Sequence, residues 1–131
     1  MDFERGIWQA AMDGNLAKVK ILVKKNKNNV SATDQSGYTP LHYACRHQKL
    51  EIVKFLIQNG SPTDPVTPST LSTPLHRAVL GTNEDISIQI LQFLVKNGGD
   101  VKRKDCDGAT ALDKAKHFEK KKVEEYLLSF K

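Results

Sequence analysis

A short phrase recurs along this chain at nearly constant spacing, and this recurrence constrains the fold more than any other feature. Residues 39–44 read TPLHYA, residues 73–78 read TPLHRA and residues 110–115 read TALDKA, with a degenerate copy, IWQA, at 7–10. The copies end in alanines that are 34, 34 and 37 residues apart: Ala10, Ala44, Ala78 and Ala115. A period of this size is typical of supersecondary units that stack on one another.

The local chemistry of each copy predicts two short helices. Thr39 and Thr73 are suitable N-caps, because a hydroxyl can accept a hydrogen bond from a free N–H of the first turn. The proline that follows each threonine loses no hydrogen bond at the first helical position. A second, apolar phrase with helical spacing comes next, and in the second copy it predicts a helix over about 50–58. Such a helix would end at Asn59-Gly60, where glycine accepts a left-handed backbone.

A polar segment with the pattern Asp-x-x-Gly precedes two of the copies, as DQSG at 34–37 and DCDG at 105–108. These segments predict hairpin-like fingers, with Gly37 and Gly108 at positions where other residues would be strained. The order of elements is therefore helix, helix, finger, repeated. One such unit cannot bury its apolar face alone, so the units must stack.

With this phrase, period and order of elements, the chain resembles the ankyrin repeat family over about residues 5–130. The resemblance implies an all-α repeat solenoid: an ankyrin-repeat stack of paired antiparallel helices with projecting hairpin fingers. We expect a single domain over residues 1–131, in which the first and last repeats cap the stack. The expected repeats cover about 1–33, 34–66, 67–104 and 105–131.

The third copy departs from the pattern in two places. Residues 60–72 contain three prolines and no Asp-x-x-Gly, and Leu71 stands where the second copy has a glycine. Because proline lacks an N–H, we expect an irregular, partly extended loop here rather than a regular two-stranded finger. Four additional residues fall within 81–90, where we expect a longer loop, with Asp85 or Ser87 capping the next helix. Both departures fit either drift in tolerant surface segments or adaptation to a partner.

The histidines and cysteines do not predict catalysis or metal binding. The resemblance implies that His42 and His76, inside the recurrent phrase, link the loops of adjacent repeats by hydrogen bonds. Cys45 is expected to be buried and inert, and Cys106 to be exposed at a finger tip. The sequence has no usual zinc-ligand spacing, no nucleophile motif and no phosphate-binding glycine motif. We therefore expect no enzyme activity, no metal site and no cofactor.

The chain is mildly basic, with a net charge of +5, which favours acidic partners without defining a nucleic-acid binder. Basic residues cluster at 24–27, 102–104 and 120–122, at ends of units that could share one edge of the stack. They are either solvated helix ends or a surface for an acidic ligand, such as an acidic peptide, nucleic acid or an anionic lipid. Nucleic acid is disfavoured because no aromatic residues alternate with the lysines.

The same sequence features give an expectation for location and assembly. Two cysteines are few for a secreted domain, and no signal peptide or long apolar run is present. We expect a monomer in the cytoplasm, the nucleus or both, without membrane insertion.

The resemblance also implies a function, which is that of a non-catalytic adaptor binding another protein. In that family the partner usually lies against a concave groove formed by finger tips and the first helices of the units. Trp8 could extend this surface, although it occupies the position of a structural histidine and could instead be packed. The expected contacts are Gln35, Ser36, Tyr38, Tyr43, Arg46, Thr70, Leu71, Arg77, Leu80, Cys106, Asp107, Lys114 and His117.

Overall fold

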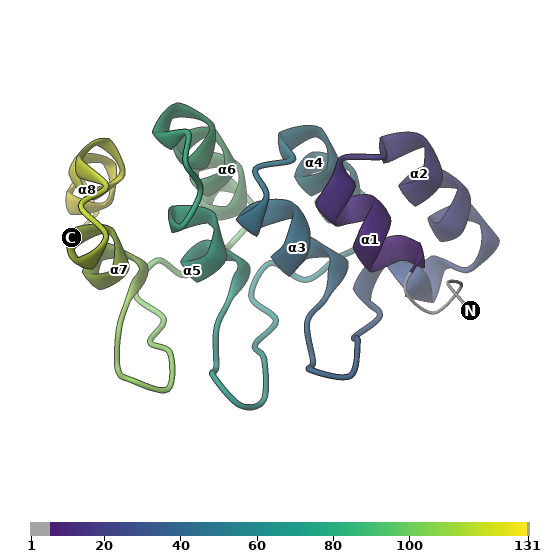
Figure 1. Ribbon diagram of the computed structural model, residues 1–131, viewed down its shortest axis with the longest axis horizontal. Coiled ribbons are helices and arrows are strands. Elements are labelled where there is room, and N and C mark those ends of the chain that lie inside the picture. The colour runs from purple at the N-terminus through teal and green to yellow at the C-terminus, as the bar shows by residue number, and fades with distance from the viewer. Residues whose placement is uncertain (1–5, 131) are drawn as a thin grey trace.

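The computed structural model describes residues 6–130, which form a row of helix pairs (Figure 1). These residues contain eight α-helices and no β-strand, and none of the helices is long and apolar enough to cross a membrane. The first helices of the pairs are α1 (Gly6–Asp13), α3 (Pro40–Arg46), α5 (Pro74–Val79) and α7 (Ala111–His117). The second helices are α2 (Leu16–Lys25), α4 (Leu50–Gln58), α6 (Glu84–Lys96) and α8 (Lys121–Leu128), and a 3₁₀ turn, η2 (Lys27–Ser31), follows α2.

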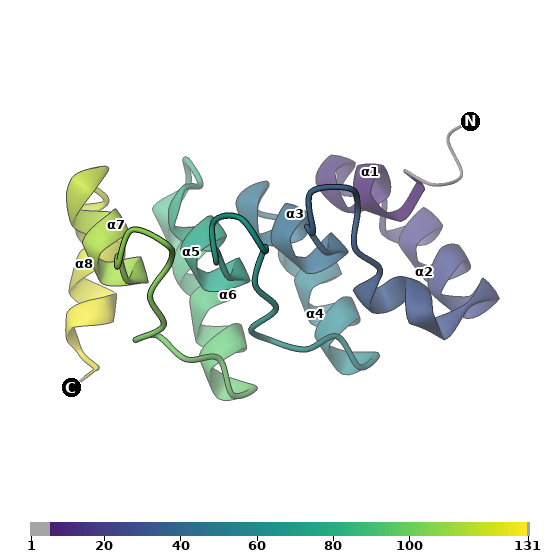
Figure 2. The same ribbon diagram turned by 90° about the horizontal axis from the view of Figure 1, so that it is seen from below.

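The helices form two parallel rows, and the fingers project from one side of the stack. Figures 1 and 2 show the first helices in one row and the second helices in the other. Within the rows, α3 packs against both α1 and α5, and α6 packs against both α4 and α8. Three loops between successive pairs extend downward in Figure 1. The predicted all-α repeat solenoid of paired helices is therefore confirmed.

Threonine caps begin three of the first helices, at the predicted Thr39 and Thr73 and also at Thr110. The Thr39 hydroxyl accepts a hydrogen bond from the His42 N–H at 3.3 Å, and the His42 ring nitrogen Nδ1 accepts one from the Thr39 N–H at 3.1 Å. The same reciprocal capping box forms at Thr73 and at Thr110. Each box provides acceptors for two backbone N–H groups that a helix start would otherwise leave free. The predicted second helix over 50–58 is also found, as α4.

The core is thin and runs along the stack between the two rows. Its alanines allow neighbouring first helices to approach, and its larger side chains come mainly from the second helices. The bulky aliphatic side chains that are most completely buried include Leu41, Ile52, Leu56, Leu75, Ile90, Leu91 and Leu94. Every unit contributes to this layer, so each helix pair buries its apolar face against a neighbour.

Two buried histidines link successive units. The Nε2 atom of His42 lies 2.9 Å from the carbonyl oxygen of Ser72, and that of His76 lies 2.9 Å from the carbonyl oxygen of Ala109. Burial lowers the pKa of both rings, so each is neutral, accepting at Nδ1 and donating at Nε2. The structural role expected of these histidines is confirmed.

The four additional residues of the third unit lengthen a helix, and the expectation of a longer loop was wrong. Helix α6 has 13 residues where α4 has 9, and the difference lies at its start. Its N-cap is Asn83, whose side-chain oxygen accepts a hydrogen bond from the Ile86 N–H at 3.2 Å. Neither Asp85 nor Ser87 is therefore the cap. Asparagine is as good a cap as either, and the acidic residues that follow it favour the first turn of a helix.

The three fingers are named after the unit that each begins, so they are the second, third and fourth fingers. The third finger is more regular than its prolines predict. The N–H of Thr67 donates to the carbonyl oxygen of Ser72 at 3.2 Å, just as that of Asp34 donates to the Tyr38 oxygen at 3.0 Å in the second finger. Leu71 has a φ of +54° and takes the left-handed place that a glycine with a φ of +84° takes in the second finger. The prediction of an irregular loop was right for the residues before Thr67 and wrong for the tip, because side-chain hydroxyls replace the missing aspartate there.

Candidate functional site

The finger tips and the first helices occupy the same side of the stack, where sequence analysis places the binding surface (Figure 2). The N–H of Cys106 donates to the carbonyl oxygen of Thr70 at 2.8 Å and so ties the fourth finger to the third. The side chain of Thr70 is half-buried. The predicted contacts that are exposed on the fingers are Gln35, Ser36, Leu71, Cys106 and Asp107.

Three predicted residues meet in one half-buried group, which we call the Tyr38 cluster and which consists of Asp34, Tyr38, Tyr43 and Arg77. The Tyr43 hydroxyl donates to the Asp34 carboxylate, and the centroids of the Tyr38 and Tyr43 rings are 5.6 Å apart. The Arg77 Cζ atom lies 4.5 Å from the centroid of the Tyr38 ring, and its Nη2 atom donates to the Tyr38 hydroxyl. The second finger is thereby joined to both α3 and α5.

Electrostatics keep Tyr43 protonated in this cluster. Burial, followed by the hydrogen bond to the Asp34 carboxylate, raises the pKa of Tyr43 to about 12. The phenol therefore remains a hydrogen-bond donor to Asp34 at all ordinary pH values. The tyrosine that holds the finger against α3 therefore does not ionise near neutral pH.

A matching contact forms in the last unit of the stack. The Lys114 ammonium on α7 lies 3.1 Å from the carboxylate of Asp105, the first residue of the fourth finger turn. Burial alone would raise the pKa of Asp105, but the Ala109 N–H and the Lys114 ammonium hold it below its usual range. Lys114 is thus half-buried and already paired with an acid of its own unit.

Asp34 and Asp105 are functional candidates that the list of expected contacts omits. Each lies nine residues before the helix residue that it binds, Tyr43 or Lys114. Each is also the aspartate of an Asp-x-x-Gly segment. That constant spacing was the available signal, because the sequence analysis treated these aspartates only as turn residues.

Other predicted contacts lie away from the fingers. Arg46 and His117 are the last residues of α3 and α7, and Leu80 is the C-cap of α5. The length of a helix therefore separates each of them from its finger. Trp8 is half-buried, and its Nε1–H donates to the carbonyl oxygen of Ala32 at 2.8 Å, so it is packed and does not extend the surface.

The side chains that could take part in chemistry are dispersed. Cys45 is buried, which raises the pKa of its thiol, and Cys106 is exposed, as expected. Across residues 6–130, no three histidine, cysteine, aspartate or glutamate side chains gather closely enough to bind a metal ion. In this part of the chain, the polar side chains described above form packing contacts and helix caps.

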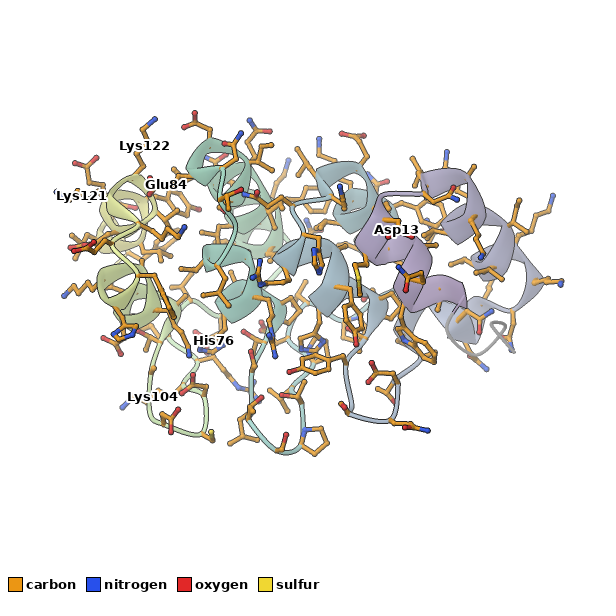
Figure 3. All side chains as sticks on the ribbon, viewed as in Figure 1. Asp13, His76, Glu84, Lys104, Lys121 and Lys122 are labelled. Carbon is orange, nitrogen blue, oxygen red and sulfur yellow. The ribbon has the colours of Figure 1, made fainter. Side chains whose placement is uncertain are left out.

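The basic clusters do not all share one edge of the stack. Figure 3 shows Lys104 beside the fingers, while Lys121 and Lys122 lie near the opposite edge. The expectation of a common edge was wrong for this last cluster, because α8 begins where the two helices of its pair turn, away from the fingers. Lys122 also lies 3.5 Å from the Asp85 carboxylate.

A shallow hollow between α2 and α4 holds another group of cations. Its lining includes Lys20, Lys24 and Lys27 around the half-buried ring of Phe55. The Lys20 Nζ atom lies 5.9 Å from the centroid of that ring. Three lysines and one aromatic ring therefore line a single hollow on the side of the second helices.

Comparison with known proteins agrees with this geometry. A family model described as ankyrin repeats (3 copies) matches residues 7–105, and the chain belongs to the ankyrin repeat family. It is 46% identical over 67 residues to human ankyrin repeat domain-containing protein 39, which covers 51% of this chain and 36% of that protein. It is 34% identical over 122 residues to human ankyrin repeat and SOCS box protein 11, covering 93% of this chain and 35% of that protein. The chain thus spans about a third of the length of these two relatives.

The family is in general a non-catalytic module for protein–protein interaction. As a member of this family, the chain belongs to a class of protein that in general binds other proteins.

Proposed function

We propose that this chain is a non-catalytic adaptor that binds another protein with its fingers and the first helices of its units. The observation that carries the proposal is the Tyr38 cluster, in which a finger and two first helices form one continuous surface. Tyrosine and arginine are among the residues that contribute most to binding energy at protein interfaces. The three neighbouring fingers carry further exposed residues.

The surface is preformed, which favours binding. The N–H of Cys106 donates to the Thr70 carbonyl oxygen at 2.8 Å, so that the third and fourth fingers are joined. Gly37 lies so close to the Pro68 ring that an added Cβ atom would collide with the ring. The second finger is therefore in close contact with the third. Since little order is gained on binding, a rigid surface loses less conformational entropy when a partner docks.

The test is affinity capture from lysate at physiological salt with three forms of the chain. The finger variant carries Gln35→Ala, Leu71→Gly and Asp107→Ala, all at exposed positions. The control variant carries Ile21→Ala and Gln92→Ala, which are exposed on the second helices. We expect the native and control forms to capture the same proteins and the finger variant to lose them. Equal capture by all three forms would refute the proposal.

A second candidate function is electrostatic binding of an acidic ligand, and the hollow around Phe55 favours it. Removing charge with Lys20→Gln, Lys24→Gln and Lys27→Gln should abolish salt-sensitive binding of an acidic polypeptide such as polyglutamate. The matched control replaces three lysines at the start of α8, residues 120–122, by glutamine. If both variants weaken binding equally, net charge and not this hollow is responsible.

A further inference from the structure

Two of the three fingers supply an acidic partner to their own first helix. In the second finger the Asp34 carboxylate accepts the hydrogen bond of the Tyr43 hydroxyl. In the fourth finger the Asp105 carboxylate pairs with the Lys114 ammonium at 3.1 Å. The helix residue that corresponds to Tyr43 and Lys114 in the third unit is Arg77, since each of the three directly precedes the alanine of the recurrent phrase.

The third finger provides no such acid. The backbone bond of Thr67 to Ser72 at 3.2 Å corresponds to the bond of Asp105 to Ala109 at 2.9 Å. Thr67 therefore takes the place of the aspartate, although the third turn has one residue more and Thr67 lies ten residues, not nine, before Arg77. Its hydroxyl is already used, because it binds the Thr70 hydroxyl and accepts from the Ser72 N–H at 3.2 Å. A neutral and fully occupied hydroxyl therefore stands where the other fingers have a carboxylate.

Arg77 consequently has no counter-ion in the part of the chain that the structure describes. It makes no ion pair there, and its Nε atom is buried without a hydrogen-bond partner. The neighbouring Asp34 is committed elsewhere, since it accepts from the Ser36 N–H at 3.0 Å, the Tyr38 N–H at 2.9 Å and the Tyr43 hydroxyl. Arg77 is half-buried, so its unmatched charge is also only partly solvated.

The Tyr38 ring holds the guanidinium in place. The Cζ atom lies 4.5 Å from the ring centroid, and the tyrosine hydroxyl accepts from Nη2. An arginine stacked on an aromatic ring is oriented while its remaining N–H donors stay available for a planar acceptor. A carboxylate is the acceptor that matches this fork, with two parallel hydrogen bonds.

Resting on the proposed function, we propose that Arg77 is the anchor for an aspartate or glutamate side chain of the partner protein. The partner's carboxylate takes the role that Asp34 and Asp105 play for the neighbouring units. A singly charged carboxylate fits better than a doubly charged phosphate, because Asp34 and Asp105 are negative charges in the two flanking units. The specificity of the groove is thus for an acidic residue opposite the third unit.

The first experiment measures binding of a blocked tetraglutamate peptide to the whole chain by NMR, with a blocked tetraglutamine peptide as the uncharged control. We expect tetraglutamate to shift the Arg77 Nε–Hε resonance and tetraglutamine to leave it in place. Arg77→Gln should weaken tetraglutamate binding about tenfold or more, because a charge-assisted bidentate contact is lost. Lys96→Gln, which removes one positive charge from the exposed end of α6 on the row of second helices, should change it by less than about twofold.

Thr67→Asp is the second variant, because it restores the acid that the other fingers carry. Its new carboxylate should pair with Arg77 and weaken tetraglutamate binding about tenfold, without removing any positive charge. This variant keeps the proposal testable if Arg77→Gln disturbs the fold. Equal weakening by Arg77→Gln and Lys96→Gln, or unchanged binding in Thr67→Asp, would overturn the assignment.

The capture experiment separates this inference from the proposed function. If the finger variant loses its captured proteins while Arg77→Gln retains every one, the adaptor function stands and the carboxylate anchor is wrong. If Arg77→Gln and Thr67→Asp both lose the proteins that Lys96→Gln retains, both proposals are supported.

Discussion

Leu71, at the tip of the third finger, has a left-handed backbone and leaves 42% of its side chain exposed. A residue with a Cβ atom is strained in this conformation by roughly 1–2 kcal/mol. The hydrogen-bonded turn around it holds it there, through the N–H of Leu71 and the Thr67 carbonyl oxygen at 2.7 Å. Strain of this kind often marks positions that face a ligand.

Replacing Leu71 by glycine should therefore stabilise the chain. We expect the free energy of unfolding, measured by urea denaturation, to rise by about 1 kcal/mol, since part of the relief is offset by a more flexible unfolded chain. Leu71→Ala is the matched control, because it removes the same exposed apolar surface but keeps the Cβ atom. If both variants are equally stabilised, the exposed side chain and not the backbone is the cause.

The buried histidines make stability depend on pH. Burial lowers the pKa of His42 and His76 from the usual 6.5, so the unfolded chain binds more protons than the folded chain as the pH falls below that value. Stability should thus be full above about pH 7 and decline as the pH falls through 6 toward 5. Thermal melts across this range should show the midpoint falling.

A matched pair of variants assigns this effect. His42→Gln removes one buried ring and should flatten the dependence of the melting temperature on pH. His117→Gln replaces an exposed ring and is the matched control. Identical pH profiles for the two variants would show that the buried ring is not the source.

At the scale of elements, the additional turn of α6 connects three units. Toward the second unit, the Asn83 N–H donates to the side-chain oxygen of Gln48 at 3.1 Å, and the Gln48 amide donates to the Ser87 hydroxyl at 3.1 Å. Ahead of it, the Glu84 carboxylate accepts from the Lys122 N–H at 2.9 Å, and Figure 3 shows these two residues close together. The insertion acts as a structural link between neighbours.

Glu84 also caps α8, which has no side-chain cap of its own. Its carboxylate serves both the Lys122 N–H and the Val123 N–H. Glu84→Ala should lower the free energy of unfolding by about 1 kcal/mol in urea titrations, and Glu84→Gln by less. Glu125→Ala, at an exposed position of α8, should have an effect below about 0.5 kcal/mol. An equal loss at both positions would contradict the capping role.

At the scale of the whole molecule, stability depends on contacts between units, because each unit is only two helices thick. Leu56 is fully buried in this shared core, whereas Ile21 on α2 is 61% exposed. Leu56→Ala should lower the free energy of unfolding by about 2–5 kcal/mol. Ile21→Ala should change it by less than about 0.5 kcal/mol. Urea stability that is the same for both variants would count against a continuous core.

The sequence predicted which residues lie on the candidate surface better than it predicted their contacts with one another. Tyr38, Tyr43 and Arg77 were expected at the groove because the family resemblance fixes which face each helix turns toward the fingers. Their mutual contacts were not predictable, since Arg77 meets Tyr38 from 39 residues away. The contact between Arg77 and Tyr38 depends on how successive units are offset in the stack, and core packing determines that offset.

The sequence by itself determined the class of fold and the local structure. Threonine caps, helix-starting prolines and turn glycines act within a few residues, and the period of the phrase requires stacking. The tertiary structure alone decided how the departures from that period are absorbed. Thr67 could replace an aspartate because hydroxyls and backbone groups surround it, and Glu84 could cap α8 because packing brings it within reach across 38 residues. Such choices depend on the distances between units, and side-chain packing fixes those distances.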